Sequence, residues 1–225
     1  MKIKKEYIGL IVVGLALLAI LGMWYFREFD AQGYVQAVLN QRFYGDAEAA
    51  VIFVDDKTEE ELIQQYEMEI QSFVESNITA GVEMGEELKG QYVEICKQIF
   101  NEMDYSVKEA KKINRNEYHV PVEYNPVDVF QTFSAAVPEE KAKIEDKVEK
   151  GEYKGTKEEI TEQIQQEYLY NCCELLKTAH EEMKYAETET IVFVVKRNAD
   201  DLFAIDEVQM HEFLVKIMGL DIKQD

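Results

Sequence analysis

Basic residues are scarce in this sequence. The 225 residues include 24 Lys or Arg against 45 Asp or Glu, a formal net charge of −21, and of the acidic residues only Glu6 precedes position 28. A surface this acidic repels a phosphate backbone, and no basic stripe interrupts it, so nucleic-acid binding is excluded. The same charge repels anionic lipid and polyanionic polymers, whereas it attracts cations and basic partners. A plainer interpretation is that the charge serves solubility alone.

Cysteines are also few, and Cys96, Cys172 and Cys173 are too few and odd in number for a disulfide framework. Successive side chains of a helix point about 100° apart, so the adjacent pair suits neither a shared metal nor an unstrained bridge. We interpret the three as small buried hydrophobic residues. A thiol-redox role is the alternative.

Catalytic signatures are missing as well. His119, His180 and His211 are scattered, with neither a His-Glu-x-x-His motif nor a zinc-ligand spacing. We find no EF-hand loop, phosphate-binding loop, Gly-x-Ser-x-Gly elbow or dinucleotide fingerprint. The sequence therefore assigns no catalytic residue, no metal site and no cofactor, and it favours a non-enzyme while leaving enzymatic function open.

One long hydrophobic run is present near the start of the chain. Residues 8–26, "IGLIVVGLALLAILGMWYF", contain no charge. Nineteen helical residues span about 28 Å, close to the thickness of a bilayer core. Its segment Ile20-Leu21-Gly22-Met23 resembles a bacterial lipoprotein signal in which Met23 replaces the lipid-carrying cysteine. The bulky residues that follow offer no small-residue cleavage site, and Trp24, Tyr25 and Phe26 are typical of a membrane interface.

These features predict a single membrane span that stays on the protein. Lys2, Lys4 and Lys5 precede the run, so the positive-inside rule places the N-terminus in the cytoplasm. We predict that residues 1–27 form a cytoplasmic tip and one transmembrane anchor at the cell membrane, and that residues 28–225 form an extracellular domain. A cleaved signal peptide and a buried soluble helix are the alternatives.

Helical spacing recurs along the rest of the chain. Apolar residues lie three and four apart after Asp30, after the capping box Thr58–Glu61, and between Gly85 and Met103. A second capping box at Thr156 opens a helix of about seven turns that runs to Met183, and a last short helix ends near Met218. The segment 47–54, "AEAAVIFV", fits a helix or a strand.

Strand patterns appear in two places. Residues 118–124 alternate apolar and polar, with Pro121 typical of an edge or bulge, and residues 104–113 supply the partner across a polar turn at 113–117. Residues 190–197, "TIVFVVKR", are apolar on both faces, which predicts a central strand, and "LFAID" returns as its hairpin partner. Residues 125–133 lead out of this sheet toward a charged region at 138–150. With no internal repeat, this order predicts one α+β domain in which helices pack on a curved antiparallel sheet.

Three stretches carry a resemblance to known proteins: "AQGYVQAVLNQRFYGD", "EYNPVDVFQTF" and "ETIVFVVKRNADDLFAIDE". They resemble membrane-anchored or lipoprotein ectodomains of unknown function from Firmicutes. The resemblance implies a cystatin-like or nuclear-transport-factor-like α+β fold, and it offers no functional residues to carry over.

Aromatic residues supply the remaining site candidates. Tyr118, Tyr124, Phe130 and Phe133 are placed to line a ligand pocket between helix and sheet, although the same spacing suits a packed core. The sequence thus predicts a membrane-tethered extracellular module that binds or scaffolds an unidentified protein or small molecule. The alternative is an extracytoplasmic enzyme that uses carboxylates and a histidine in a helix–sheet cleft.

Overall fold

The computed structural model describes residues 28–54 and 57–220. The chain divides into two compact units, residues 1–30 and residues 31–225, and the second is described below. The predicted span at residues 8–26, with its interface residues Trp24, Tyr25 and Phe26, lies outside the described residues. Within the described ranges, no helix has both the length and the hydropathy needed to cross a membrane.

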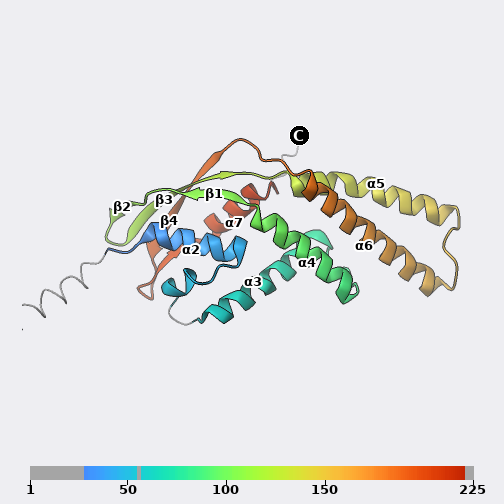
Figure 1. Cartoon of the computed structure of the whole chain (residues 1–225), viewed down its shortest axis with the longest axis horizontal. Helices are drawn as coiled ribbons and strands as arrows, with labels where there is room; N and C mark the ends of the chain where they lie inside the picture. The colour runs from blue at the N-terminus through green and yellow to red at the C-terminus, as the bar shows by residue number, and fades with distance from the viewer. Residues whose placement is uncertain (1–27, 55–56, 221–225) are drawn as a thin grey trace, which may run out of the picture. The chain divides into compact units, whose positions relative to one another are not determined.

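The second unit combines helices with an antiparallel sheet, as the sequence predicted (Figure 1). Its helical elements are α2 (Ala31–Tyr44), the 3-10 turn η1 (Ala50–Phe53), α3 (Glu59–Phe73), the π-helical turn η2 (Val74–Ile78), α4 (Glu86–Asn101), α5 (Val129–Glu149), α6 (Lys157–Glu181) and α7 (Glu207–Ile217). The strands are β1 (Asp104–Val107), β2 (Lys111–Asn114), β3 (Glu117–Asn125), β4 (Glu189–Arg197) and β5 (Phe203–Ile205).

Several local predictions are confirmed. Thr58 and Thr156 each accept a hydrogen bond from the backbone three residues on and complete a capping box at the starts of α3 and α6. The undecided segment 47–54 forms the short turn η1 rather than a long element.

The sheet is built around β3. Strands β1 and β2 pair with one side of β3, β4 pairs with the other, and β5 adds to the end of β4. The register of β1 and β2 against β3 shifts between the pair Val107–Val122 and the pair Lys111–His119. Residues 108–110 therefore form a bulge opposite Val120 and Pro121. The carbonyl of Pro121 accepts a hydrogen bond from the Lys108 N–H at 2.8 Å, so it faces this bulge. The N–H and the carbonyl of a strand residue point to the same side, so the N–H that proline lacks would also face the bulge. The predicted bulge is therefore present, but β3 is not an edge strand.

Only one face of the sheet is buried. Along β3 the side chains of Tyr118, Val120, Val122 and Tyr124 are buried while the residues between them are partly exposed. On β4, Phe193 and Val195 lie on the same covered face, whereas Val192 is 42% exposed. The expectation that β4 is buried on both faces is therefore wrong, because the helices cover one side of the sheet and leave the other open.

The charged region at 138–150 belongs to a helix that the sequence analysis did not assign. Helix α5 runs through Pro138, although the proline lacks the N–H that would bond to the carbonyl of Ser134. It pairs with α6 as a helical hairpin: Asn171 Nδ2 donates to the buried Glu140 Oε1 at 2.7 Å, and Lys147 forms an ion pair with Glu167. Packing against α6 thus stabilises a charged segment to which the sequence pattern assigned no element.

The core gathers on Phe213 of α7, which is fully buried. Its ring meets Tyr124 of β3, Phe193 of β4 and Phe43 of α2 edge-on, with centroids 5.2, 5.4 and 6.1 Å apart. One side chain therefore connects the first helix, the two long strands and the last helix.

Replacing Phe213 with Ala is expected to lower the free energy of unfolding by about 3–5 kcal/mol, because the cavity would open where four elements meet. Urea unfolding of the full chain in a nonionic detergent measures the loss. Val208→Ala, at a residue of the same helix that is 73% exposed, should change stability by no more than about 0.5 kcal/mol. Equal effects of the two substitutions would contradict this account of the core.

Candidate functional site

The four aromatic pocket candidates are buried. Tyr118, Tyr124, Phe130 and Phe133 are each at most 6% exposed, and Tyr124 donates its hydroxyl to Glu189 at 2.9 Å. Their burial places them in the core, the alternative that the sequence left open. None of them lines the groove described below, and a ligand cavity beside them stays a prediction.

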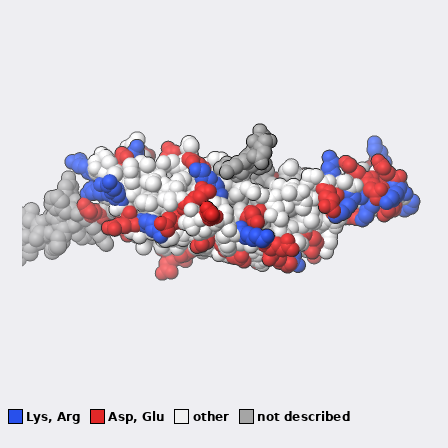
Figure 2. All heavy atoms as spheres, turned by 90° about the horizontal axis from the view of Figure 1, so that it is seen from above, with Lys and Arg blue, Asp and Glu red and all other residues white. Residues whose placement is uncertain are grey.

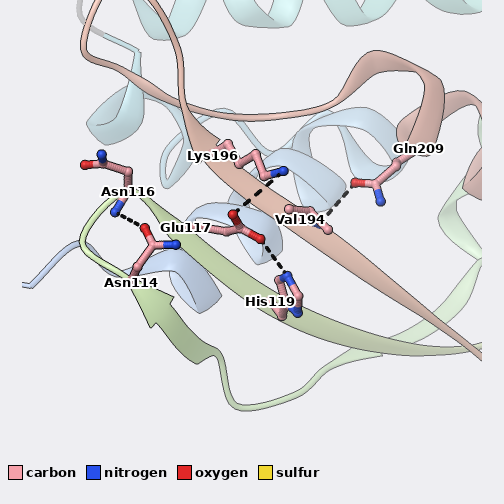
Figure 3. Close-up of polar contacts among 7 residues, drawn as sticks. All are labelled: Asn114, Asn116, Glu117, His119, Val194, Lys196 and Gln209. Atoms are coloured by element: carbon pink, nitrogen blue, oxygen red, sulfur yellow. Dashed lines mark hydrogen bonds and ion pairs between the residues drawn. The ribbon is translucent and has the colours of Figure 1, made fainter.

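The histidines lie in separate places. His119 Nε2 lies 2.9 Å from Glu117 Oε1 on the open face of the sheet, and Lys196 of β4 approaches the same carboxylate at 3.7 Å (Figure 3). His180 contacts Glu102 at 3.1 Å, and His211 is exposed on α7. The Glu117 side chain is 24% exposed, so the buried carboxylate that an acid–base site would need is not found beside His119. Figure 3 also shows the neighbouring Gln209, whose Oε1 accepts from the Val194 N–H and so covers part of the β4 edge.

The open face of the sheet around this cluster carries charged as well as apolar side chains: Lys111 lies opposite His119, and Glu123 pairs with Lys108 at 2.6 Å. Viewed from above, acidic and basic side chains are interspersed with uncharged ones, also across the middle of the surface (Figure 2). Pro121, Val192 and Val194 belong to this face, since they share the side of the sheet occupied by His119. Charges of both signs lie together along α5, where Lys143 pairs with Glu139, and at the tip of the α5–α6 hairpin, where Lys150 pairs with Asp146.

The three cysteines are free and buried between α4 and α6. Burial raises the pKa of the Cys96 thiol to about 12 and that of Cys173 to about 11, and it also raises the pKa of Cys172. Reactive thiols have lowered pKa values and access to solvent, so these groups have the character of core residues. The thiol-redox alternative has no support in this geometry.

We expect the native protein to react slowly with a thiol reagent such as DTNB at pH 8, because the thiols are both buried and protonated. In urea all three thiols should react at the rate of an ordinary cysteine. Absorbance at 412 nm follows both reactions. A native thiol that reacts as fast as in urea would reinstate a redox role.

A groove separates the N-terminal parts of α4 and α6. Farther along, the two helices are in contact: Tyr92 of α4 is 1% exposed and donates its hydroxyl to the carbonyl of Leu169 at 2.6 Å. Before that contact the helices part and leave an open groove of about 950 Å³. Gln165 Nε2 donates to the carbonyl of Glu83 at 2.7 Å, which ties α6 to the loop before α4.

The groove is lined by apolar, amide and acidic side chains. Its apolar lining residues are Met84, Leu88, Leu169 and Tyr170, and its amides are Gln91, Gln165 and Gln166. Four carboxylates also line it, those of Glu83, Glu87, Glu158 and Glu162, whereas Lys157 is the single basic residue among the described lining residues. A ligand with positive charge and apolar surface would meet complementary groups here.

The groove does not have the properties of a metal centre. Within residues 28–54 and 57–220, no three His, Cys, Asp or Glu side chains are arranged to hold a metal ion. The carboxylates are spread along both walls, an arrangement that suits recognition of distributed charge.

Sequence reasoning missed this site, although part of its signal is visible in the sequence. Glu158, Glu162, Gln165, Gln166 and Leu169 follow one helical stripe beside the core-facing residues of α6. That stripe is typical of a solvated helix face. Only the separation of α4 from α6, which depends on tertiary packing, turns it into one wall of a groove.

No family model matches the chain, and no curated protein matches it. Among solved structures, the chain resembles the 2.62 Å crystal structure described as "a putative lipoprotein (ycdA)" from Bacillus subtilis subsp. subtilis str. 168. The TM-score is 0.51 at 17% sequence identity, and the match covers 84% of this chain and 56% of that one. At this identity the likeness shows the fold alone. It confirms that the α+β arrangement occurs in a solved protein, and the present chain spans little more than half the length of that protein.

Proposed function

We propose that this protein is a membrane-tethered extracytoplasmic binding module, and that the groove between α4 and α6 binds a cationic ligand. One observation carries the proposal: four carboxylates and a single amine line an open groove of about 950 Å³. This volume lies within the range of ligand sites, about 300–1,000 Å³. The cystatin-like or nuclear-transport-factor-like type of fold suggested by the resemblance is part of the proposal.

The N-terminal sequence supports a membrane tether. Residues 8–26 have the length and composition of a span, and Met23 occupies the place of the cysteine that a lipoprotein would acylate. The protein of similar fold from Bacillus subtilis is described as a lipoprotein, which would hold its domain outside the membrane by lipid. Here a retained span would do the same task, with the N-terminus in the cytoplasm and residues 28–225 outside.

The anchor makes a direct prediction. The mature protein should fractionate with membranes and retain residues 1–23, and protease added outside spheroplasts should digest the domain after residue 28. Mass spectrometry of the purified full chain reads its N-terminus. A Met23→Cys variant supplies the missing acceptor as a matched control and should gain a lipid when processed. A wild-type chain that begins after Met23 would refute the retained anchor.

The excess of carboxylates over amines in the groove favours a positively charged ligand. Three of the four carboxylates, Glu87, Glu158 and Glu162, lie on helices whose backbones hold them beside the groove. At physiological ionic strength the Debye length is about 8 Å, so only charges lying in or next to the groove contribute strongly. A cation seated there interacts with several carboxylates at once, whereas an anion is repelled.

A triple substitution tests the site. Glu87→Gln, Glu158→Gln and Glu162→Gln together should weaken binding of fluorescein-labelled octalysine about tenfold at 150 mM salt, since each lost pair contributes roughly 0.2–1 kcal/mol. Fluorescence anisotropy with the full chain in a nonionic detergent measures the affinity. Octaglutamate should not bind.

The matched control removes the same net charge elsewhere. Glu109→Gln, Glu174→Gln and Glu207→Gln alter three exposed carboxylates that do not line the groove. This variant should bind octalysine as the unmodified chain does. Equal weakening in both triple variants would mean that the overall field, and not the groove, attracts the probe.

A further inference from the structure

The shape of the groove narrows the class of ligand. We infer that its occupant is a basic amphipathic α-helix of a partner protein, an inference that rests on the proposed function.

The dimensions fit one helix. The α6 residues that line the groove run from Lys157 to Tyr170 along one stripe, a length of about 20 Å at 1.5 Å per residue. A helix about 10 Å in diameter and 20 Å long, half immersed, displaces about 800 Å³. The groove holds about 950 Å³ and is open to solvent, so a helix can enter it from outside.

The walls favour a helix over an extended peptide. An extended segment needs a strand edge to satisfy its backbone, as in β-augmentation, and the lining residues of α6 and of α4 after Gly85 belong to helices. A helix satisfies its own backbone and offers only side chains to such walls. The occupant would continue the packing that α4 and α6 make with each other beyond Tyr92 and Leu169.

The chemistry of the walls specifies an amphipathic partner. Met84 and Leu88 on the α4 side and Tyr170 on α6 offer apolar surface, and Tyr170 is 53% exposed. Carboxylates accompany this surface on both walls, Glu83 and Glu87 on one and Glu158 and Glu162 on the other. A helix with an apolar stripe bordered by Lys or Arg matches both features, since long basic side chains can lie along apolar surface and reach a carboxylate.

A second copy of this chain is a poor occupant. Each chain carries a formal charge of −21, so two acidic domains repel each other at such an interface. The complementary charge has to come from a different protein.

The test uses two peptides of identical composition. One is an 18-residue Leu/Lys peptide designed as an amphipathic helix, and the other is its diastereomer with four residues in the D form, which keeps the charge and hydropathy but prevents a continuous helix. The full chain in a nonionic detergent should bind the all-L peptide at least tenfold more tightly. Circular dichroism at 222 nm should show added helix only with the all-L peptide.

Groove variants assign this preference to the site. Leu88→Gln combined with Tyr170→Gln should weaken binding of the all-L peptide about tenfold, and an unchanged far-UV circular dichroism spectrum of the free variant verifies that it is folded. Ile52→Gln combined with Val208→Gln alters two residues that are 76% and 73% exposed outside the groove and should have no effect.

The possible failures are distinguishable. If the diastereomer binds as tightly as the all-L peptide, and both depend on Glu87, Glu158 and Glu162, the groove binds cations but does not select a helix, and the inference is wrong. If no basic probe depends on those carboxylates, the proposed function itself is wrong.

Discussion

The packing of Phe213 is the contact on which the rest of the domain depends. Its ring meets α2, β3 and β4 from the last helix of the chain, and it lies on the covered face of the sheet. This contact joins residues that are far apart in sequence, and through it α7 completes the helical cover of the sheet. The opposite face then stays open, and the helices α4, α5 and α6 are free to build a second packed region with its own geometry.

That second region explains why a groove exists. The paired core residues of α4 and α6, among them Tyr92, Cys96, Leu169 and Cys173, bring the helices together over part of their lengths. Toward their N-terminal ends these side chains give way to glutamate and glutamine, which cannot be buried against each other without a large desolvation cost. The helices therefore separate where their facing residues become polar. The buried thiols belong to the packed region that borders the groove.

The sequence was sufficient for elements whose signals are local. Capping boxes at Thr58 and Thr156 locate two helix starts, and alternation along residues 118–124 locates β3 and its buried face. Helix α5 was not assigned because Pro138 and a dense run of Glu and Lys give no clear helical signal, whereas Phe130, Phe133 and Ile144 are buried along the helix. The sidedness of β4 could not be predicted, since "TIVFVV" does not indicate that helices cover one face only.

The candidate site was harder to predict than the fold. The four aromatic candidates are buried, and apolar periodicity is the same for a packed interior and for a pocket, so the sequence pattern alone does not separate the two. The groove residues are glutamate, glutamine and a few apolar side chains of ordinary types, and their role follows from the separation of two helices that are distant in sequence. Binding of a cationic helix between those walls would explain the acidic composition and the apolar lining of the groove. Such a function requires no catalytic motif.

Hydrogen–deuterium exchange of the full chain, with and without the all-L basic peptide, tests this account most directly. Binding in the groove predicts new protection in residues 83–91 and 157–170, with the β-sheet unchanged. Protection spread evenly over the acidic surface, or centred on the open face near His119, would contradict it.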